Sequence, residues 1–322
     1  MSSYYFLKQG PSLQRIALAG NDPITITQVL NVPIDPNCKV NVSLDLDDSR
    51  AALAPSVFCH EQTTGDVFYY FDDRGTYRKQ VLGNIPVTWQ LQVCRMYRRD
   101  STGEFFHSQI FGHNRNTDPK DPHYQKVRLW NVKGDFMKPI ELGKVGAEWD
   151  LMLGDFNNDG TLDILGRKTT TTSQGNEGDL HVWFTEDGGT RIRDGGHHAG
   201  NIGLAWNLQV ADMNSDGNDD IFGYNANGDL WVWHNITDPD GVGTGRFSLG
   251  QSYGTLGPDW KNLQVTILRD SASAFDILGL APSNGEVHGW FTNRTAIFKS
   301  QSLETGRSGW TPVAGLPLTR VA

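Results

Sequence analysis

The chain has 322 residues, a formal net charge of −9 and a pI near 5.4, so it lacks the basic surface that nucleic acid or an anionic membrane would require. Its three cysteines, Cys38, Cys59 and Cys94, are too few and too scattered for a disulfide framework or a zinc site. Because there is no apolar leader and no apolar run of about 18 residues, we expect a cytoplasmic protein without a membrane partner.

One sequence unit recurs along the chain, and its weakest copies come first. The segment 4–16 (YYFLKQGPSLQRI) has the pattern of a second and a third strand without a first strand. Segments 56–71 (SVFCHEQTTGDVFYYF) and 109–130 (QIFGHN…KVRLW) repeat this pattern, and the latter has a longer loop between the two strands. These segments predict short antiparallel strands and no helix.

The clear copies follow at 149–183 and 206–233. Each contains a Trp, a short apolar strand, an Asp-rich turn, a D-I-[LF]-G strand, a polar loop and a final G-D-L-x-V-W strand. A third copy, 260–290, keeps the last two strands but loses the Asp-rich turn, and 310–322 resembles a first strand with nothing after it. The stretches after the clear copies, including His197-His198 and GQSYG (250–254), are interpreted as links between units.

The incomplete first and last copies complement each other, which favours a closed ring over an open solenoid. The last apolar position of each third strand recurs about every 50 to 60 residues. We therefore predict an all-β, six-bladed β-propeller with four-stranded antiparallel blades, closed by pairing of the N- and C-terminal segments in one blade. The predicted blades are 310–322 with 1–38, then 39–87, 88–146, 147–203, 204–257 and 258–309.

The two Asp-rich turns predict structural Ca²⁺ sites. Hard oxygen ligands recur at the same spacing, and Gly160 and Gly217 allow a sharp turn. Gly166 and Gly223 stand where an EF-hand carries its bidentate Glu, so these are turns between strands. The alternative is a turn rich in Asp and Asn without metal. The predicted ligands, counting the carbonyl oxygens of Thr161 and Asn218, are Asp155, Asn157, Asp159, Thr161 and Asp163 in the first turn and Asp212, Asn214, Asp216, Asn218 and Asp220 in the second.

In these motifs the chain resembles the FG-GAP (VCBS-like) repeat family, which is found in integrin α-subunit propellers and in fungal and bacterial lectins. DFNNDGTLDILG and DMNSDGNDDIFG, followed by GDLHVW and GDLWVW, carry the resemblance. It is specific over 147–300 and weak before 147. It implies calcium turns on one face of a propeller, and it implies no particular function.

Candidate chemistry lies at the opposite ends of the predicted second strands. The residues there are Lys8, His60, His113, Arg167, Tyr224 and Leu280, and all except Leu280 can donate hydrogen bonds. Near them lie tryptophans that open the first strands, namely Trp89, Trp149, Trp206, Trp260 and Trp310. Together they predict one aromatic-lined central pocket, although the tryptophans could equally wedge the blades together.

Two main functions fit this pattern. The first is a cofactor-free cyclase for an apolar substrate, in which the five donors are catalytic and the tryptophans bind substrate. In fold and size the chain is similar to the propeller-like hetero-Diels–Alderases of fungal tropolone–sesquiterpene pathways. The second is a carbohydrate-binding lectin, and a protein-interaction scaffold is a third reading. No organic cofactor is expected, and the sequence makes no prediction of the oligomeric state.

Overall fold

The structure is a computed structural model that describes most of the chain. In the described part, no helix is long and apolar enough to cross a membrane. The turn of the third repeat copy, 267–274, and most of the terminal segment 310–322 lie outside the described residues. The described residues are 3–9, 11–19, 25–44, 55–73, 75–94, 109–132, 136–171, 176–193, 195–266, 275–281 and 283–313.

The chain divides into two compact units, each containing three four-stranded antiparallel sheets. The unit formed by residues 37–204 contains blades 2, 3 and 4. Blade 2 consists of β4 (Cys38–Leu44), β5 (Pro55–Glu61), β6 (Asp66–Asp73) and β7 (Thr76–Asn84). Blade 3 consists of β8 (Trp89–Cys94), β9 (Gln109–Asn114), β10 (Lys126–Asn131) and β11 (Ile140–Lys144). Blade 4 consists of β12 (Trp149–Gly154), β13 (Asp163–Lys168), β14 (Asp179–Trp183) and β17 (His197–Asn201).

The other unit, residues 1–36 with 205–322, contains blades 5, 6 and 1. Blade 5 consists of β18 (Trp206–Ala211), β19 (Asp220–Asn225), β20 (Asp229–Trp233) and β23 (Gln251–Thr255). Blade 6 consists of β24 (Lys261–Thr266), β25 (Asp276–Ala281), β26 (Glu286–Thr292) and β27 (Ile297–Glu304). Blade 1 consists of β28 (Thr311–Pro312), β1 (Ser3–Gln9), β2 (Ser12–Ala19) and β3 (Thr25–Pro33).

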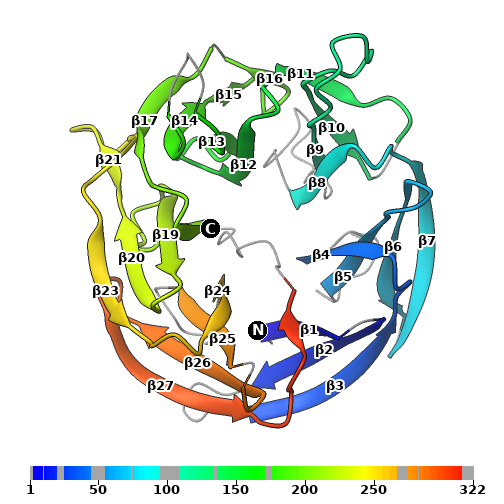
Figure 1. The fold of residues 1–322 in the computed structure, drawn as a ribbon, viewed down its shortest axis with the longest axis vertical. Coiled ribbons are helices and arrows are strands. Elements are labelled where there is room, and N and C mark those ends of the chain that lie inside the picture. Colours follow the sequence, from blue (N-terminus) through cyan, green and yellow to red (C-terminus); the bar gives the residue numbers. More distant parts are fainter. Residues whose placement is uncertain are drawn as a thin grey trace. The chain divides into compact units, whose positions relative to one another are not determined.

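The two ends of the chain share one blade. The red C-terminal strand β28 pairs with the blue β1 through Lys8↔Thr311 (Figure 1). Six antiparallel four-stranded sheets and this shared blade confirm the predicted all-β, six-bladed propeller. Blades 4 and 5 each add a two-stranded hairpin before the fourth strand, made of β15 (Thr185–Glu186) with β16 (Arg191–Ile192), and of β21 (Asn235–Thr237) with β22 (Gly243–Phe247).

A pair of tryptophans packs inside each of blades 3 to 6. In blade 4 the rings of Trp149 and Trp183 meet edge to face, with centroids 5.3 Å apart at 90°. Gly166 lies between them on β13, where a Cβ atom would be 2.6 Å from Trp183 and 3.0 Å from Trp149. The glycine of the D-I-[LF]-G motif is therefore needed to admit the indoles. In blade 3 the pair Trp89–Trp130 lies over Gly112 in the same way. In blades 5 and 6 the pairs Trp206–Trp233 and Trp260–Trp290 recur, and a Cβ at Gly223 or Gly279 would meet the third-strand Trp and a leucine.

Side-chain amides on first strands connect neighbouring blades within each unit. Gln92 on β8 donates to the carbonyl oxygen of Leu151 on β12 at 2.7 Å. Gln209 on β18 donates to the carbonyl of Leu263 on β24 and accepts from the amide N–H of Val265 at 2.8 Å. These bonds satisfy polar groups that would otherwise be buried unpaired, so they fix how first strands lie beside each other.

We expect Gly166→Ala to destabilise the protein by about 1–3 kcal/mol, because the new methyl group overlaps both indoles of blade 4. Urea unfolding monitored by tryptophan fluorescence measures this change. Gly203→Ala is the matched control, since a Cβ at Gly203 meets nothing within 4 Å. Equal stabilities of the two variants would contradict the packing argument.

Candidate functional site

The two Asp-rich turns have the same backbone conformation, as their sequences predict. Residues Asn158 and Ser215 are left-handed, with φ of 55° and 60°. In the first turn Asp155 accepts hydrogen bonds from the amides of Asp159 at 3.2 Å and Gly160 at 2.9 Å. The equivalent Asp212 accepts from the second turn's two corresponding amides, both at 3.1 Å. The two turns, although separate in the sequence, therefore adopt the same local structure.

The ninth-position aspartates, Asp163 and Asp220, hold their blades together. Asp163 is fully buried and accepts from the amides of Phe156 at 3.2 Å and Thr185 at 2.8 Å. It therefore joins the turn to the first residue of the hairpin strand β15, just after the third strand. In blade 6 the buried Asp276 keeps the equivalent bond to Thr292 at 3.2 Å, although that repeat lacks the ligand residues. This position consequently has a structural role that needs no metal.

Electrostatics favour a cation at the first turn. Burial, reinforced by the nearby Asp159 carboxylate, raises the pKa of Asp155 to about 6 and that of Asp163 to about 8. Burial likewise raises the pKa values of Asp212 and Asp220. The largest cause of each shift is the burial of the carboxylate, which disfavours its charged form. Within the described residues, however, no three His, Cys, Asp or Glu side chains are placed to hold a metal ion together. The oxygen donors fit Ca²⁺ in kind, and calcium binding stays a prediction.

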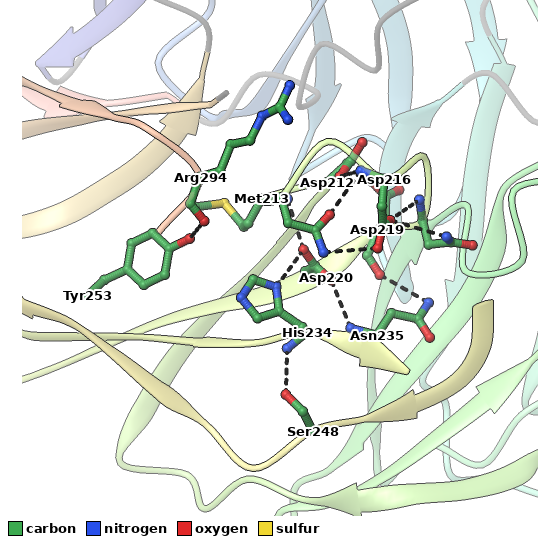
Figure 2. Close-up of polar contacts among 12 residues, drawn as sticks. Asp212, Met213, Asp216, Asp219, Asp220, His234, Asn235, Ser248, Tyr253 and Arg294 are labelled. Atoms are coloured by element: carbon green, nitrogen blue, oxygen red, sulfur yellow. Dashed lines mark hydrogen bonds and ion pairs between the residues drawn. The ribbon is translucent and has the colours of Figure 1, made fainter. Parts of the chain in front are cut away.

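The second turn differs because its Asp220 also contacts a histidine, and because it makes further contacts to the hairpin of its blade (Figure 2). His234 Nδ1 lies 3.1 Å from the Asp220 carboxylate. The buried Asn218 side chain accepts from the amide of Gly243 at 2.7 Å and donates to the carbonyl of Gly241 at 3.2 Å. These contacts clamp the β21–β22 hairpin against the turn. Blade 4 carries Phe184 where blade 5 carries His234, so the two turns differ in charge.

Two of the predicted catalytic donors, His60 and His113, are buried, each with 1% of its surface exposed. His60 Nε2 donates to the carbonyl of Ile85 at 2.9 Å, and His113 Nε2 donates to the carbonyl of Val145 at 3.0 Å. Each imidazole therefore joins the end of a second strand to the segment after the fourth strand of its own blade. Burial lowers the pKa of both residues, which keeps the rings neutral.

The other predicted donors are partly exposed. Burial lowers the pKa of the Arg167 guanidinium, an effect that the charge of Asp150 opposes, and burial raises the pKa of Tyr224. Lys8 lies in β1 opposite Thr311, and Leu280, the sixth position, is buried. The structure adds a neighbour that sequence reasoning missed. Arg115 donates to Gln90 at 3.4 Å and lies 3.8 Å from Asp150, which is the register partner of Arg167.

The predicted substrate-binding tryptophans belong to blade cores to different degrees. Trp89 and Trp149 are buried in the indole pairs of blades 3 and 4. Trp206, Trp260 and Trp310 keep part of their surface exposed. Trp310 lies under the Arg307 guanidinium, 5.2 Å from its ring centroid. The single aromatic pocket stays a prediction.

Each of blades 3 to 6 carries a row of side chains on the face that holds its indole pair, and the third- and fourth-strand members of each row are partly or fully exposed. We call it the Trp-face strip. In each blade the strip begins at the first-strand Trp, joined in blades 3 to 5 by that residue's register partner on the second strand. It continues to the third-strand residue two positions before the second Trp of the pair. It ends at the fourth-strand register partner of that third-strand residue. Its members are Trp89, Asn114, Arg128 and Glu141 in blade 3; Trp149, Lys168, His181 and His198 in blade 4; Trp206, Asn225, Trp231 and Ser252 in blade 5; and Trp260, His288 and Ser302 in blade 6.

Each strip combines an aromatic surface with polar groups. In blade 6 the His288 ring lies 5.3 Å from Trp260, and its Nδ1 donates to Glu286 at 3.0 Å. In blade 4 His181 lies 4.8 Å from Trp149. Blade 5 places a third indole, Trp231, at 5.8 Å from Trp206. A carboxylate opens the third strand in these blades: Asp179, Asp229 and Glu286. In the sequence, the variable residue x of the G-D-L-x-V-W motif is the third-strand member of the strip, and it could have indicated this site.

Comparisons with solved structures agree with the fold. The chain is similar to AofleA from Arthrobotrys oligospora, with 10% identity, 99% of this chain and 90% of that chain covered, and a TM-score of 0.53. It is also similar to the Aleuria aurantia lectin, a fungal lectin with a six-bladed β-propeller fold and a novel fucose recognition mode, with 11% identity, 96% and 90% coverage, and a TM-score of 0.51. No protein-family model and no curated protein matches the chain. The resemblance to FG-GAP repeats therefore stays a resemblance, and the shared property is the six-bladed propeller.

We expect chelation of Ca²⁺ to lower the melting temperature by roughly 5 °C, because an ion bound only by the folded state stabilises it. Calorimetry with EGTA and with added CaCl₂ measures this shift. Asp155→Asn should reduce the calcium response, whereas Asp187→Asn, at an exposed left-handed turn position, should preserve it. An unchanged melting temperature together with no metal by elemental analysis would refute the calcium prediction.

The contribution of the two buried histidines to stability should decrease as the pH falls below about 6.5, opposite in sign to that of the buried aspartates. His60 and His113 have folded-state pKa values below the usual 6.5, so the unfolded chain takes up protons more readily. Each buried histidine then costs about 1 kcal/mol per pH unit. Urea unfolding between pH 7 and pH 5 should give a shallower slope for His113→Gln than for the exposed control His198→Gln. Equal slopes for the two variants would contradict this assignment.

Proposed function

We propose that the protein binds carbohydrate through its Trp-face strips. The observation that carries the proposal is the recurrence, on several blades, of a partly exposed aromatic or cationic side chain lying on an indole beside a carboxylate. An aromatic surface packs against the apolar face of a sugar ring, while carboxylates accept hydrogen bonds from its hydroxyl groups. A repeated site of this kind gives avidity for glycans that display several sugars.

Blade 6 offers the most complete set of contacts. The carboxylate of Glu286 accepts a hydrogen bond from His288 at 3.0 Å. Both side chains are partly exposed, Glu286 by 24% and His288 by 17%. The imidazole packs against both indoles of the blade, with its centroid 5.3 Å from that of Trp260 and 4.8 Å from that of Trp290. Ser302, its exposed register partner, adds a hydroxyl group. The site therefore presents both donors and acceptors next to an indole.

The fold supports this proposal in a limited way. The Aleuria aurantia lectin, whose structure is described by its fucose recognition, shares the six-bladed propeller at 11% identity. That likeness extends to the fold alone, so the choice of sugar must come from this chain's own residues.

The cyclase hypothesis depends on fewer side chains than the sequence suggested. His60 and His113 already donate to backbone carbonyls, so a catalytic role for either ring would require breaking that bond. Arg167, Tyr224 and Lys8 are then the remaining donors for such a reaction. Ligand stoichiometry separates the two functions, because a cyclase needs one pocket and a lectin has several sites.

We expect native mass spectrometry with a panel of monosaccharides and short glycans to detect more than one bound sugar per chain. His288→Ala should remove one binding event, because it deletes the imidazole that lies against Trp260 and Glu286. Thr305→Ala, an exposed position in the loop after β27 of the same blade, is the control and should bind as the unmodified chain does. One apolar ligand per chain with no sugar binding would instead favour the cyclase.

A further inference from the structure

We propose that the strip of blade 3 binds a carboxylate-bearing sugar, such as a uronate, rather than a neutral sugar. This inference rests on the proposed carbohydrate binding and names the ligand class of one site. It follows from the charge of this strip, from nitrogen atoms that lack hydrogen-bond partners, and from their placement on one face of the sheet.

The charge of blade 3 is reversed relative to the other strips. Its third strand opens with Lys126, where blades 2, 4, 5 and 6 have Asp66, Asp179, Asp229 and Glu286. Two positions later Arg128 replaces a histidine or an aromatic residue. Both cations share a single carboxylate, since Lys126 Nζ lies 2.8 Å and Arg128 Nη2 lies 3.4 Å from Glu141. Within this group of three the cations outnumber the carboxylate by one, and the loop after β9 adds the carboxylate of Asp121. An anionic ligand would have to displace Glu141 from Arg128.

Three side chains of this region carry a buried nitrogen that has no hydrogen-bond partner within the protein. They are Asn114 Nδ2, His123 Nδ1 and Arg128 Nε. Asn114 is 0% exposed and uses its oxygen to accept from the amide of Asn116 at 2.8 Å, so its NH₂ group is the part left over. A buried donor without a partner destabilises the folded state, so each such group needs an explanation. A ligand rich in acceptor oxygens can approach the Arg128 guanidinium, whose side chain is 18% exposed, whereas the Asn114 amide is 0% exposed.

The register places these groups on one side of blade 3. Trp89 pairs with Asn114, and Gly112 pairs with Arg128, so alternation along the strands brings all four positions to the same face. The Arg128 guanidinium lies 5.5 Å from the Trp89 ring, and the His123 ring lies 6.0 Å from it. The donors therefore surround one indole.

The loop between β9 and β10 completes this site and is ordered by its own polar contacts. Asn116 donates to the carboxylate of Asp121, and the same carboxylate accepts from the amide of His123 at 2.6 Å. Asn114, which bonds to the amide of Asn116, is thus connected to His123 through the loop. This loop spans residues 115–125 and is longer than the corresponding loops of blades 5 and 6, which are 226–228 and 282–285.

Guanidinium groups recognise carboxylates through two parallel N–H donors, which a neutral hydroxymethyl group cannot match. D-glucuronate and D-glucose differ at this one substituent, so the pair tests the charge of the ligand alone. We expect the full chain to bind glucuronate at one site. The dissociation constant of glucose at that site should be at least tenfold higher. This preference should decrease as NaCl is raised, because the attraction is electrostatic.

The experiment is isothermal titration of both sugars, with native mass spectrometry for stoichiometry. Arg128→Gln should abolish the preference for glucuronate, whereas Arg193→Gln, which removes an exposed cation from blade 4, should preserve it. Glu141→Gln should strengthen glucuronate binding, because it removes the carboxylate that competes for Arg128. A gain in affinity cannot arise from misfolding, so this variant tests the site even where Arg128→Gln is unstable.

The outcomes separate this inference from the proposal on which it rests. Binding of neutral sugars with no preference for glucuronate, or a preference that Arg128→Gln leaves unchanged, would overturn the acidic-sugar site and leave carbohydrate binding intact. Absence of binding by every sugar would overturn both. A glucuronate preference lost in Arg128→Gln and enhanced in Glu141→Gln would establish the site.

Discussion

The edge-to-face contact between two indoles over a glycine organises blades 3 to 6. It joins the first and third strands across the second, at centroid distances of 4.6 to 5.4 Å. Because a methyl group on the glycine would overlap the rings, the contact fixes the residue type on the second strand. It also fixes the surface beside it, since the residue two positions before the third-strand Trp lies on the same face. The same indole pair thus belongs to the core of the blade and determines where the proposed binding strip lies.

The sequence was informative where turn chemistry and aromatic spacing repeat. The Asp-rich turns, the second and third strands, and the blade shared by both termini follow from such residues. The fourth strands were missed. Segment 197–201 and GQSYG (250–254) were interpreted as links, yet they form β17 and most of β23. Fourth strands carry neither the Trp nor the Asp that marks the other strands, and their edge position leaves them polar and without a distinctive pattern.

The candidate site was harder to predict because burial and neighbours cannot be read from residue type. His60 and His113 are polar residues at strand ends, and only the fold shows that each imidazole is buried against a backbone carbonyl. The Trp-face strip was missed for a different reason. Its members come from four strands that are far apart in the sequence, and their alignment depends on register. A single sequence gives the repeat but not the row of side chains that crosses it.

The amide bonds between first strands have a consequence for how the blades can diverge. Gln92 and Gln209 each supply the donor side chain, while the neighbouring blade supplies only its main-chain atoms at Leu151, Leu263 and Val265. Since every residue type has the same main chain, a substitution at those neighbouring positions leaves the bond available. Adjacent blades are therefore coupled without any requirement for matched side chains. Each blade is free to change its own surface chemistry, which is how blade 3 can carry Lys126 where blade 4 of the same unit carries Asp179.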